Sequence, residues 1–308
     1  MSAPGRSKIV RREVGANVWL GFDGSELLVG PSQKLCFEIL ETEEAVGRAM
    51  FEEIEEAASV KRGDLVIILL GGRGAQALHR LLGRMAQRGE GDALLGRLQV
   101  FTQDALAPMR MDNQLSFVRD FERLLGDAFF EKVKSFTPIW TNTGDLEGEM
   151  ARYVEKLESL GGIDIFFLGH GPESEAASHL AYIKPESGAT ANDFAGVIPI
   201  SSSILEHHIA KFKAGGSSVT EEDERECRLA SHILTLGPAA ILGAKRVVQS
   251  VVDASTAPAK RASYSRVLET EISEDVEERA KQMDANPGLW IRLHSNVRSL
   301  ILPDVLQS

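Results

Sequence analysis

Short, strongly apolar segments alternate along the chain with longer amphipathic ones. The apolar segments predict strands at 64–70, 98–102, 163–168 and 246–252. The run at 64–70 is apolar almost throughout, which is typical of a strand covered on both faces of a parallel sheet. Apolar residues at helical spacing predict helices at 41–60, 75–87, 117–133, 147–160, 221–242 and 258–268. The alternation predicts an α/β protein, a three-layer α/β/α Rossmann-like architecture built on a mostly parallel sheet.

Four further segments give weaker patterns. Residues 139–141 predict a strand at the sheet edge, and 291–302 have strand-like content at the end of the chain. Residues 211–226 are polar and indicate a solvated loop. If a helix begins at Pro172, Glu175 and His179 lie on the same face of it, because they are four residues apart.

The first 33 residues differ from the rest of the chain. They carry basic residues at Arg6, Lys8, Arg11 and Arg12. They also contain two short apolar runs, 18–20 and 27–29, that predict a hairpin. We therefore expect an N-terminal extension at 1–33 and a single domain at 34–308.

Composition narrows the classes of function. The net charge of −11 and the pI of about 5.2 argue against a general binder of nucleic acid or anionic membranes. The two cysteines, Cys36 and Cys227, have no CxxC spacing, so neither a disulfide framework nor a thiolate zinc site is expected. No leader-like segment and no run of 18 apolar residues is found in this sequence. These features predict a cytoplasmic protein.

A glycine-rich turn, Gly71-Gly72-Arg73-Gly74, follows the strand predicted at 64–70. Glycines let the backbone approach a ligand, and the helix that follows offers free N–H groups with its positive dipole end. The guanidinium of Arg73 could grip a phosphate. The same residues also fit a tight turn whose arginine points into water. The spacing matches neither a Walker A motif nor a GxGxxG fingerprint.

Two more strand ends carry titratable residues. Asp104 follows the strand at 98–102, where a carboxylate could act as a general base or simply cap a turn. His170, Glu173 and Glu175 follow the strand at 163–168, and His179 lies four residues beyond Glu175. A His–Glu pair at that spacing is a catalytic dyad, a metal half-site or a surface ion pair. No further ligands have metal-like spacing, so neither a metal nor a cofactor is expected.

These motifs, taken in order, resemble those of the glucosamine-6-phosphate deaminase/6-phosphogluconolactonase family. The glycine-rich turn resembles the family's phosphate loop, and Asp104 resembles the first residue of its Asp-Glu pair. The turn at 169–175 is similar to its Gly-x-Gly-x-Asp-Gly-His. The remaining similar segments are 116–117, 127–133, 234–247 and 290–297. The resemblance covers roughly residues 34–304 and implies the sugar-phosphate isomerase fold.

The resemblance also implies roles for individual residues. Phosphate would be bound by Gly71, Gly72, Arg73, Gly74 and Lys260. Asp104 would move the proton, and Glu173 or Glu175 would assist ring opening. His170 and His179 would contact these residues and not the substrate.

The catalytic set departs from the family's pattern at three places, one of which is the Asn-Glu-Pro of the deaminases, not recognisable near 180–182. Ala105 stands where the family's pair has Glu, and Glu175 stands where the spacing expects the histidine. The residues that bind phosphate are therefore expected to be retained, whereas the catalytic residues differ from those of the family.

Three functions follow from the resemblance. The first is an isomerase or deaminase of a phosphorylated (amino) sugar that works by proton transfer at Asp104. The second is a hydrolase of a phosphorylated sugar lactone. The third is a sugar-phosphate binder with reduced catalysis. In each case the partner is a small sugar phosphate, not nucleic acid or a membrane, and the chain could form a homo-oligomer.

Overall fold

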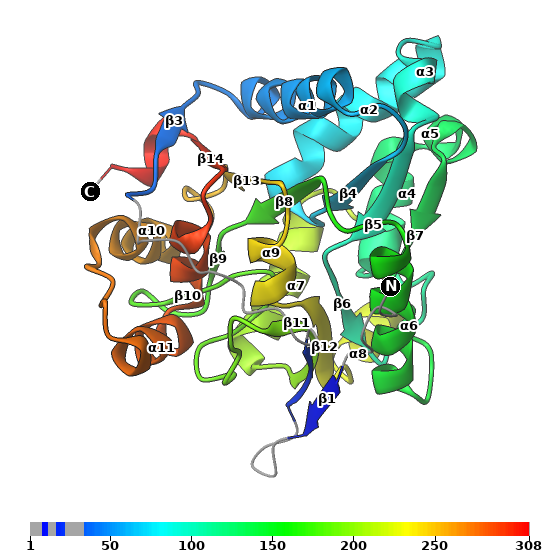
Figure 1. Ribbon diagram of the computed structural model, residues 1–308. Helices are drawn as coiled ribbons and strands as arrows, with labels where there is room; N and C mark the ends of the chain where they lie inside the picture. Colours follow the sequence, from blue (N-terminus) through cyan, green and yellow to red (C-terminus); the bar gives the residue numbers. More distant parts are fainter. Residues whose placement is uncertain (1–7, 12–16, 22–33, 308) are drawn as a thin grey trace, which may run out of the picture.

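The computed structural model describes residues 8–11, 17–21 and 34–307. In that part, a seven-stranded sheet has the order β3-β14-β13-β8-β4-β5-β7, and all neighbouring strands are parallel (Figure 1). The strands are β3 (Phe37–Ile39), β4 (Leu65–Leu69), β5 (Leu98–Thr102), β7 (Ser135–Thr137), β8 (Ile165–Gly169), β13 (Arg246–Val251) and β14 (Val297–Ile301). The predicted α/β fold with a parallel sheet is confirmed.

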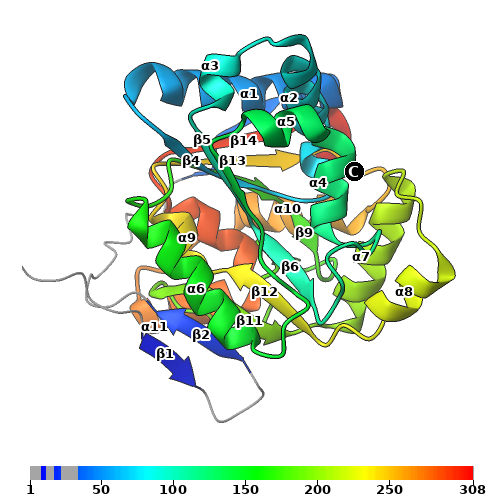
Figure 2. The same ribbon diagram turned by 90° about the vertical axis from the view of Figure 1, so that its right-hand side faces the viewer.

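Helices cover both faces of this sheet. Figure 2 shows α1, α2 and α5 above the sheet and α6, α9 and α10 below it. The helices are α1 (Glu43–Val60), α2 (Gln76–Arg88), α3 (Asp92–Leu95), α4 (Phe117–Leu125), α5 (Asp127–Lys132), α6 (Leu146–Ser159), α7 (Ser202–Ala214), α8 (Glu221–Cys227), α9 (Pro238–Leu242), α10 (Ala259–Glu269) and α11 (Val276–Ala285). Short 3-10 turns are η1 (Arg73–Ala75), η2 (Pro287–Leu293) and η3 (Pro303–Val305).

Local side chains fix several helix ends. Thr42, Ser116 and Asp145 each accept a hydrogen bond from a backbone amide in the first turn of α1, α4 and α6. Such caps satisfy amides that have no partner inside the helix. Gly126 adopts a positive φ of 70° and ends α4, so the single helix predicted at 117–133 is divided into α4 and α5.

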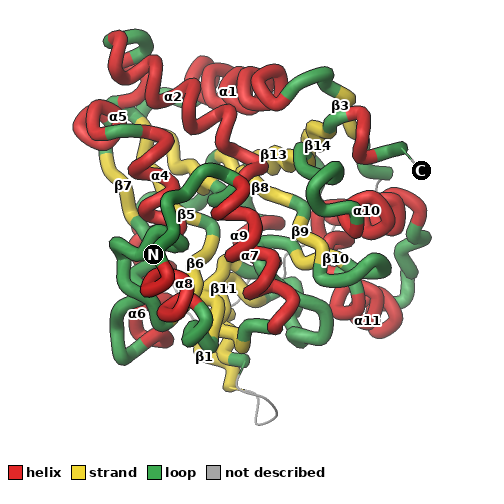
Figure 3. Tube along the Cα trace, turned by 180° about the vertical axis from the view of Figure 1, so that it is seen from behind, coloured by secondary structure: helices red, strands yellow, loops and turns green. Residues whose placement is uncertain are grey.

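A second, antiparallel sheet was not predicted. Its order is β1-β2-β11-β12-β6, seen in Figure 3 beside α7 and α8. The strands are β1 (Lys8–Arg11), β2 (Val18–Gly21), β6 (Asp104–Ala107), β11 (Asp193–Pro199) and β12 (His232–Leu236). The helix predicted over 221–242 is wrong in its centre, because β12 runs through it between α8 and α9. Pairing with β11 and β6 overrides the apolar spacing read there as helical.

Four smaller expectations also need correction. Residues 139–141 form no strand, since the sheet edge is β7, a few residues earlier. The segment 211–226 is a loop only between α7 and α8. No helix begins at Pro172, because β9 (Gly171–Pro172) and β10 (Ser178–His179) pair as a small antiparallel hairpin. Of 291–302, the strand is limited to β14.

The chain passes from one sheet to the other at Gln103. β5 ends at Thr102 and β6 begins at Asp104. The N–H of Gln103 donates to the carbonyl of Leu69 in β4 (3.0 Å), and its carbonyl accepts from the N–H of Leu236 in β12 (3.1 Å). The Asp104 side chain therefore starts on the line where the two sheets meet.

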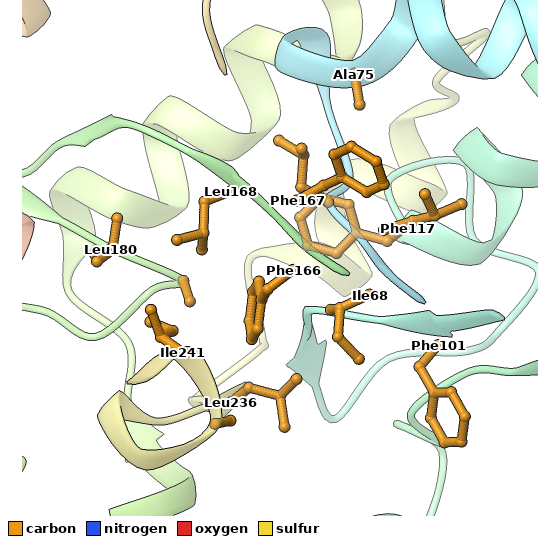
Figure 4. Packing of buried hydrophobic residues seen from close by; sticks show 14 of the residues in the cluster. Ile68, Ala75, Phe101, Phe117, Phe166, Phe167, Leu168, Leu180, Leu236 and Ile241 are labelled. Carbon is orange, nitrogen blue, oxygen red and sulfur yellow. The ribbon is translucent and has the colours of Figure 1, made fainter. Parts of the chain in front are cut away.

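The apolar core surrounds β8. Phe166 and Phe167 are both fully buried and, as neighbours on a strand, point to opposite faces of the sheet. Figure 4 shows Phe167 with Phe117 on the side of α2, and Phe166 toward Ile241 on the side of α9. This packing holds the strand ends that bear the candidate site.

Strand β2 of the N-terminal stretch is part of the second sheet. It pairs with β11 and with β1; the predicted partner at 27–29 lies outside the described residues. Trp19 is only 2% exposed and packs on Gly196, where an added Cβ would lie 2.5 Å from the indole ring. Its indole N–H donates to the carbonyl of Ser187 (3.2 Å). The division at residue 33 stays a prediction.

This packing makes Trp19→Ala a test of the N-terminal strand. Because the indole is buried, we expect the variant to lose about 3–5 kcal/mol of unfolding free energy, measured by urea denaturation. Leu229→Ala is the control, since Leu229 is 72% exposed and its loss should change stability by less than about 0.5 kcal/mol. Equal, small effects of both substitutions would contradict the role of Trp19.

Candidate functional site

A cleft opens at the carboxyl ends of β4 and β8, which are neighbours in the parallel sheet. From β4 the chain goes on to β5 and β7, whereas from β8 it goes on, after β12 of the second sheet, to β13 and β14 on the opposite side. Such a divergence leaves a crevice at the strand ends, where ligands bind in open α/β sheets. The cleft encloses about 590 Å³, part of it open to solvent. Its walls come from the turns after β4, β5 and β8 and from α7 and α10.

Asp104 lines the cleft from the junction of the two sheets. Its side chain is 2% exposed, and its Oδ2 accepts a hydrogen bond from Nε2 of Gln103 (2.6 Å). Burial raises the pKa of this carboxyl to about 7, which the Gln103 hydrogen bond offsets only in part. A carboxyl with such a pKa can both accept and donate a proton near neutral pH.

His179 enters the same cleft from β10. A Cβ at Gly171 would lie 1.7 Å from Nε2 of His179, so only glycine at 171 allows this position of the ring. The imidazole stacks on Tyr182, with ring centres 4.8 Å apart and planes within 8°. Burial lowers the pKa of His179 to about 3, so the ring is neutral at pH 7.

The turn that carries Tyr182 is strained. Ala181 and Tyr182 have φ values of 47° and 52°, a left-handed conformation that costs energy for residues with a side chain. The hydroxyl of Tyr182 is 3.3 Å from Nδ1 of His208, whose Nε2 is 2.7 Å from the carbonyl of Leu115. Since a carbonyl can only accept, Nε2 carries the proton and Tyr182 donates to Nδ1. These contacts hold the rings against one wall of the cleft.

Cationic groups gather at the end of the cleft near the glycine-rich turn. Gly72 there has a φ of 77°, which favours glycine, and η1 and α2 follow. Arg73, Lys211 and Lys260 all line the cleft. Nη2 of Arg73 donates to Oε1 of Glu43 in α1 (2.7 Å). Burial lowers the pKa of Lys260 to about 8.

The two predicted glutamates lie away from this cleft. Oε1 of Glu173 accepts from the hydroxyls of Ser201 (2.8 Å) and Ser203 (2.7 Å). Glu175 is exposed in the turn between β9 and β10. Neither lines the cleft that Asp104 lines. His170 borders it, with Nε2 2.8 Å from the hydroxyl of Ser263.

Sequence reasoning missed Lys211, Asp253 and Tyr182. Lys211 begins the segment 211–226, for which the sequence predicts a polar loop. In the structure it lies in α7, four residues after His207 and therefore on the same face of that helix. Asp253, two residues beyond β13, pairs with Lys260 (2.6 Å) and with Lys211. No sequence signal marks Asp253 as their partner.

Two findings concern other classes of function. Among the described residues, no three or more His, Cys, Asp or Glu side chains are grouped so as to hold a metal ion. In the same part of the chain, no helix combines the length and apolar character needed to cross a membrane.

This sequence and this fold are similar to those of known proteins. No protein-family model matches the chain. A curated glucosamine-6-phosphate deaminase of Staphylococcus epidermidis is 22% identical over 256 residues, which cover 83% of this chain and 90% of the relative. The resemblance to the glucosamine-6-phosphate deaminase/6-phosphogluconolactonase family is confirmed in sequence and in fold.

Solved structures of family members share the fold. A monomeric glucosamine-6-phosphate deaminase superposes with a TM-score of 0.65 at 22% identity, over 88% of this chain and 98% of that one. The 6-phosphogluconolactonase of Trypanosoma cruzi gives 0.62 at 15% identity, over 90% and 97% of the two chains.

The β9–β10 hairpin places a histidine in the cleft although none stands at the position that the family motif gives it. In the family motif Gly-x-Gly-x-Asp-Gly-His the histidine stands six residues after the first glycine. Counted from Gly169, that position is Glu175, whereas His179 is four residues further on. The hairpin brings His179 back into the cleft and leaves Glu175 outside.

Gly171→Ala tests the packing that holds His179. The new methyl group would overlap the imidazole, so we expect a loss of about 1–3 kcal/mol of unfolding free energy in urea denaturation. Gly169→Ala is the matched control, because its Cβ would meet only a methyl group of Leu70 at 3.1 Å. A Gly171→Ala variant as stable as Gly169→Ala would contradict this packing.

Asp104→Asn tests the raised pKa. The folded pKa of about 7 lies above the unfolded value near 3.8, so ionisation destabilises the fold as pH rises between them. The variant should exceed the wild type in unfolding free energy by about 1–4 kcal/mol at pH 8, and the gap should close toward pH 4.

Asp164→Asn is the control of opposite sign. Hydrogen bonds from Lys245, Lys61 and the Val66 amide lower the pKa of Asp164 despite its burial. Its carboxylate therefore stabilises the fold above pH 4, and the variant should be less stable than the wild type at pH 7. A pH-independent stability difference for Asp104→Asn would exclude the raised pKa.

Proposed function

We propose that this chain is an enzyme that moves a proton between C1 and C2 of a phosphorylated sugar or amino sugar. The observation that carries the proposal is the buried carboxyl of Asp104, with a pKa of about 7, in a cleft that has three cationic side chains at one end. Family members include deaminases of a sugar phosphate and hydrolases of a sugar-phosphate lactone, so a sugar phosphate is the expected ligand.

In the proposed reaction, the carboxylate of Asp104 accepts the proton from C2 of the open-chain aldose. The electron pair of the C–H bond forms the C1–C2 double bond of an enediol, and the C1 carbonyl oxygen gains a proton. Asp104 then returns its proton to C1, and the C2 hydroxyl loses one to become the ketone. With an amino group at C2 the same shift gives an imine, which water hydrolyses to the ketone and ammonia. No cofactor is needed for this balance.

We assign ring opening to His179 in place of Glu173 and Glu175. Its neutral imidazole can accept the proton of the C1 hydroxyl and pass it to the ring oxygen. The glycine-rich turn, Lys211 and Lys260 would bind the phosphate, as helix N-terminal amides and ammonium groups do. We also propose that the protein is cytoplasmic and that it can form a homo-oligomer.

Lactone hydrolysis is the second candidate. The unprotonated imidazole of His179 favours it, because that form can take a proton from an attacking water. This reaction comes second because it gives no part to the buried carboxyl of Asp104, the observation that carries the proposal.

Hydrogen exchange at C2 tests the proposal. In D2O, the wild type should introduce deuterium at C2 of at least one amino-sugar, hexose or pentose phosphate, read by proton NMR. Asp104→Asn should lose at least about a hundredfold in exchange rate, since it lacks the base. Glu173→Gln and Glu175→Gln are the controls and should retain exchange.

Three other results would be decisive. Exchange that persists in Asp104→Asn would remove this residue from the reaction. Hydrolysis of 6-phosphogluconolactone without C2 exchange would establish the second candidate. A rise in the unfolding temperature with sugar phosphates, without either reaction, would leave a binding protein.

A further inference from the structure

Each cationic side chain at this end of the cleft already has a carboxylate next to it. Nη2 of Arg73 donates to Oε1 of Glu43 (2.7 Å). Lys211 and Lys260 share Asp253. Glu43 and Asp253 therefore offset much of the positive charge at this end of the cleft.

Asp253 is the more buried of these two carboxylates. Its side chain is 1% exposed, and Lys260 and Lys211 are 8% and 17% exposed. Oδ1 accepts from Nζ of Lys260 (2.6 Å), and Oδ2 pairs with Lys211. Both lysines line the cleft and Asp253 does not, so the carboxylate holds the ammonium groups from behind.

Two buried ammonium groups side by side need a counter-charge. Burial and mutual repulsion disfavour their protonated forms, and an anion between them offsets both effects. A ligand phosphate would supply the same compensation with two negative charges. A carboxylate and a phosphate on the same pair of lysines would repel each other strongly in a buried site.

We propose that Asp253 is an internal counter-ion that holds Lys211 and Lys260 until a ligand binds and then yields them to its phosphate group. The inference rests on the phosphate site of the proposed function and makes Asp253 a residue that determines affinity and charge preference. Because the carboxylate must be displaced, a doubly charged phosphate binds more weakly than the lysines alone would allow.

Asp253→Asn tests this inference with inorganic phosphate as the probe. Isothermal titration at pH 7 should give a dissociation constant for phosphate at least about tenfold lower than that of the wild type, because the competing charge is gone. Binding to the variant should also take up about one proton, since the arriving phosphate restores the charge of a lysine. Titrations in two buffers with different heats of ionisation measure that uptake.

Asp164→Asn is the matched control. Asp164 is likewise held between two lysines, with its carboxylate 2.7 Å from Nζ of Lys61 and 2.8 Å from Nζ of Lys245. It directly precedes β8, at the amino-terminal ends of the strands, whereas the cleft lies at their carboxyl ends. The substitution changes the net charge by the same amount and should leave phosphate affinity within about twofold of the wild type.

The outcomes separate this inference from the proposed function. Phosphate binding by the wild type with equal or weaker binding by Asp253→Asn would overturn the counter-ion and leave the phosphate site standing. An equal gain in Asp164→Asn would assign the effect to net charge and also overturn it. No phosphate binding by any of the three proteins would overturn both the counter-ion and the phosphate site.

A structural measurement covers the case in which Asp253→Asn does not fold. In wild-type crystals soaked in phosphate, the anion should lie within hydrogen-bond distance of Nζ of Lys260, with the Asp253 carboxylate turned away from at least one lysine. Phosphate bound while Asp253 still contacts both lysines would overturn the inference.

Discussion

The rest of the structure depends on Gln103, the residue by which the chain passes between its two sheets. Its two backbone hydrogen bonds, to Leu69 and from Leu236, join a parallel sheet to an antiparallel one. The next residue, Asp104, consequently has its carboxyl buried at the junction, and burial alone gives that carboxyl its unusual pKa. The glycine-rich turn after β4 and the turns after β8 and β13 surround this point because their strands are neighbours in the parallel sheet.

Much of the parallel sheet could be predicted from local sequence. The run at 64–70 is apolar almost throughout, and the segments on either side of it have clear helical spacing. The antiparallel sheet could not be predicted in this way. β12 is short, alternates poorly and lies between helical segments, so only its pairing with β11 and β6 decides its conformation. The same holds for the β9–β10 hairpin, which forms in a segment rich in small and polar residues.

The site was predictable where it follows strand ends and unpredictable where it depends on contacts between distant segments. Asp104 and the glycine-rich turn could be expected together because both follow strands, and Lys260 was expected with them from the resemblance; all of them line one cleft. His179 was expected only beside the catalytic residues, because it stands four residues beyond the position at which the family motif has its histidine. The ion pair of Lys211 with Asp253 joins residues 42 positions apart, and neither charge alone indicates the other.

The cleft is built from parts that differ in how freely they can change. The Asp104 carboxyl is fixed at the backbone junction of two sheets, whereas one wall of the cleft is a single helix, α7, and another is a two-stranded hairpin. Substitutions or insertions in α7 and the hairpin can reshape the space for a ligand without moving the Asp104 carboxyl. Such a division would let a lineage acquire new ligands while the buried carboxyl keeps its place at the junction.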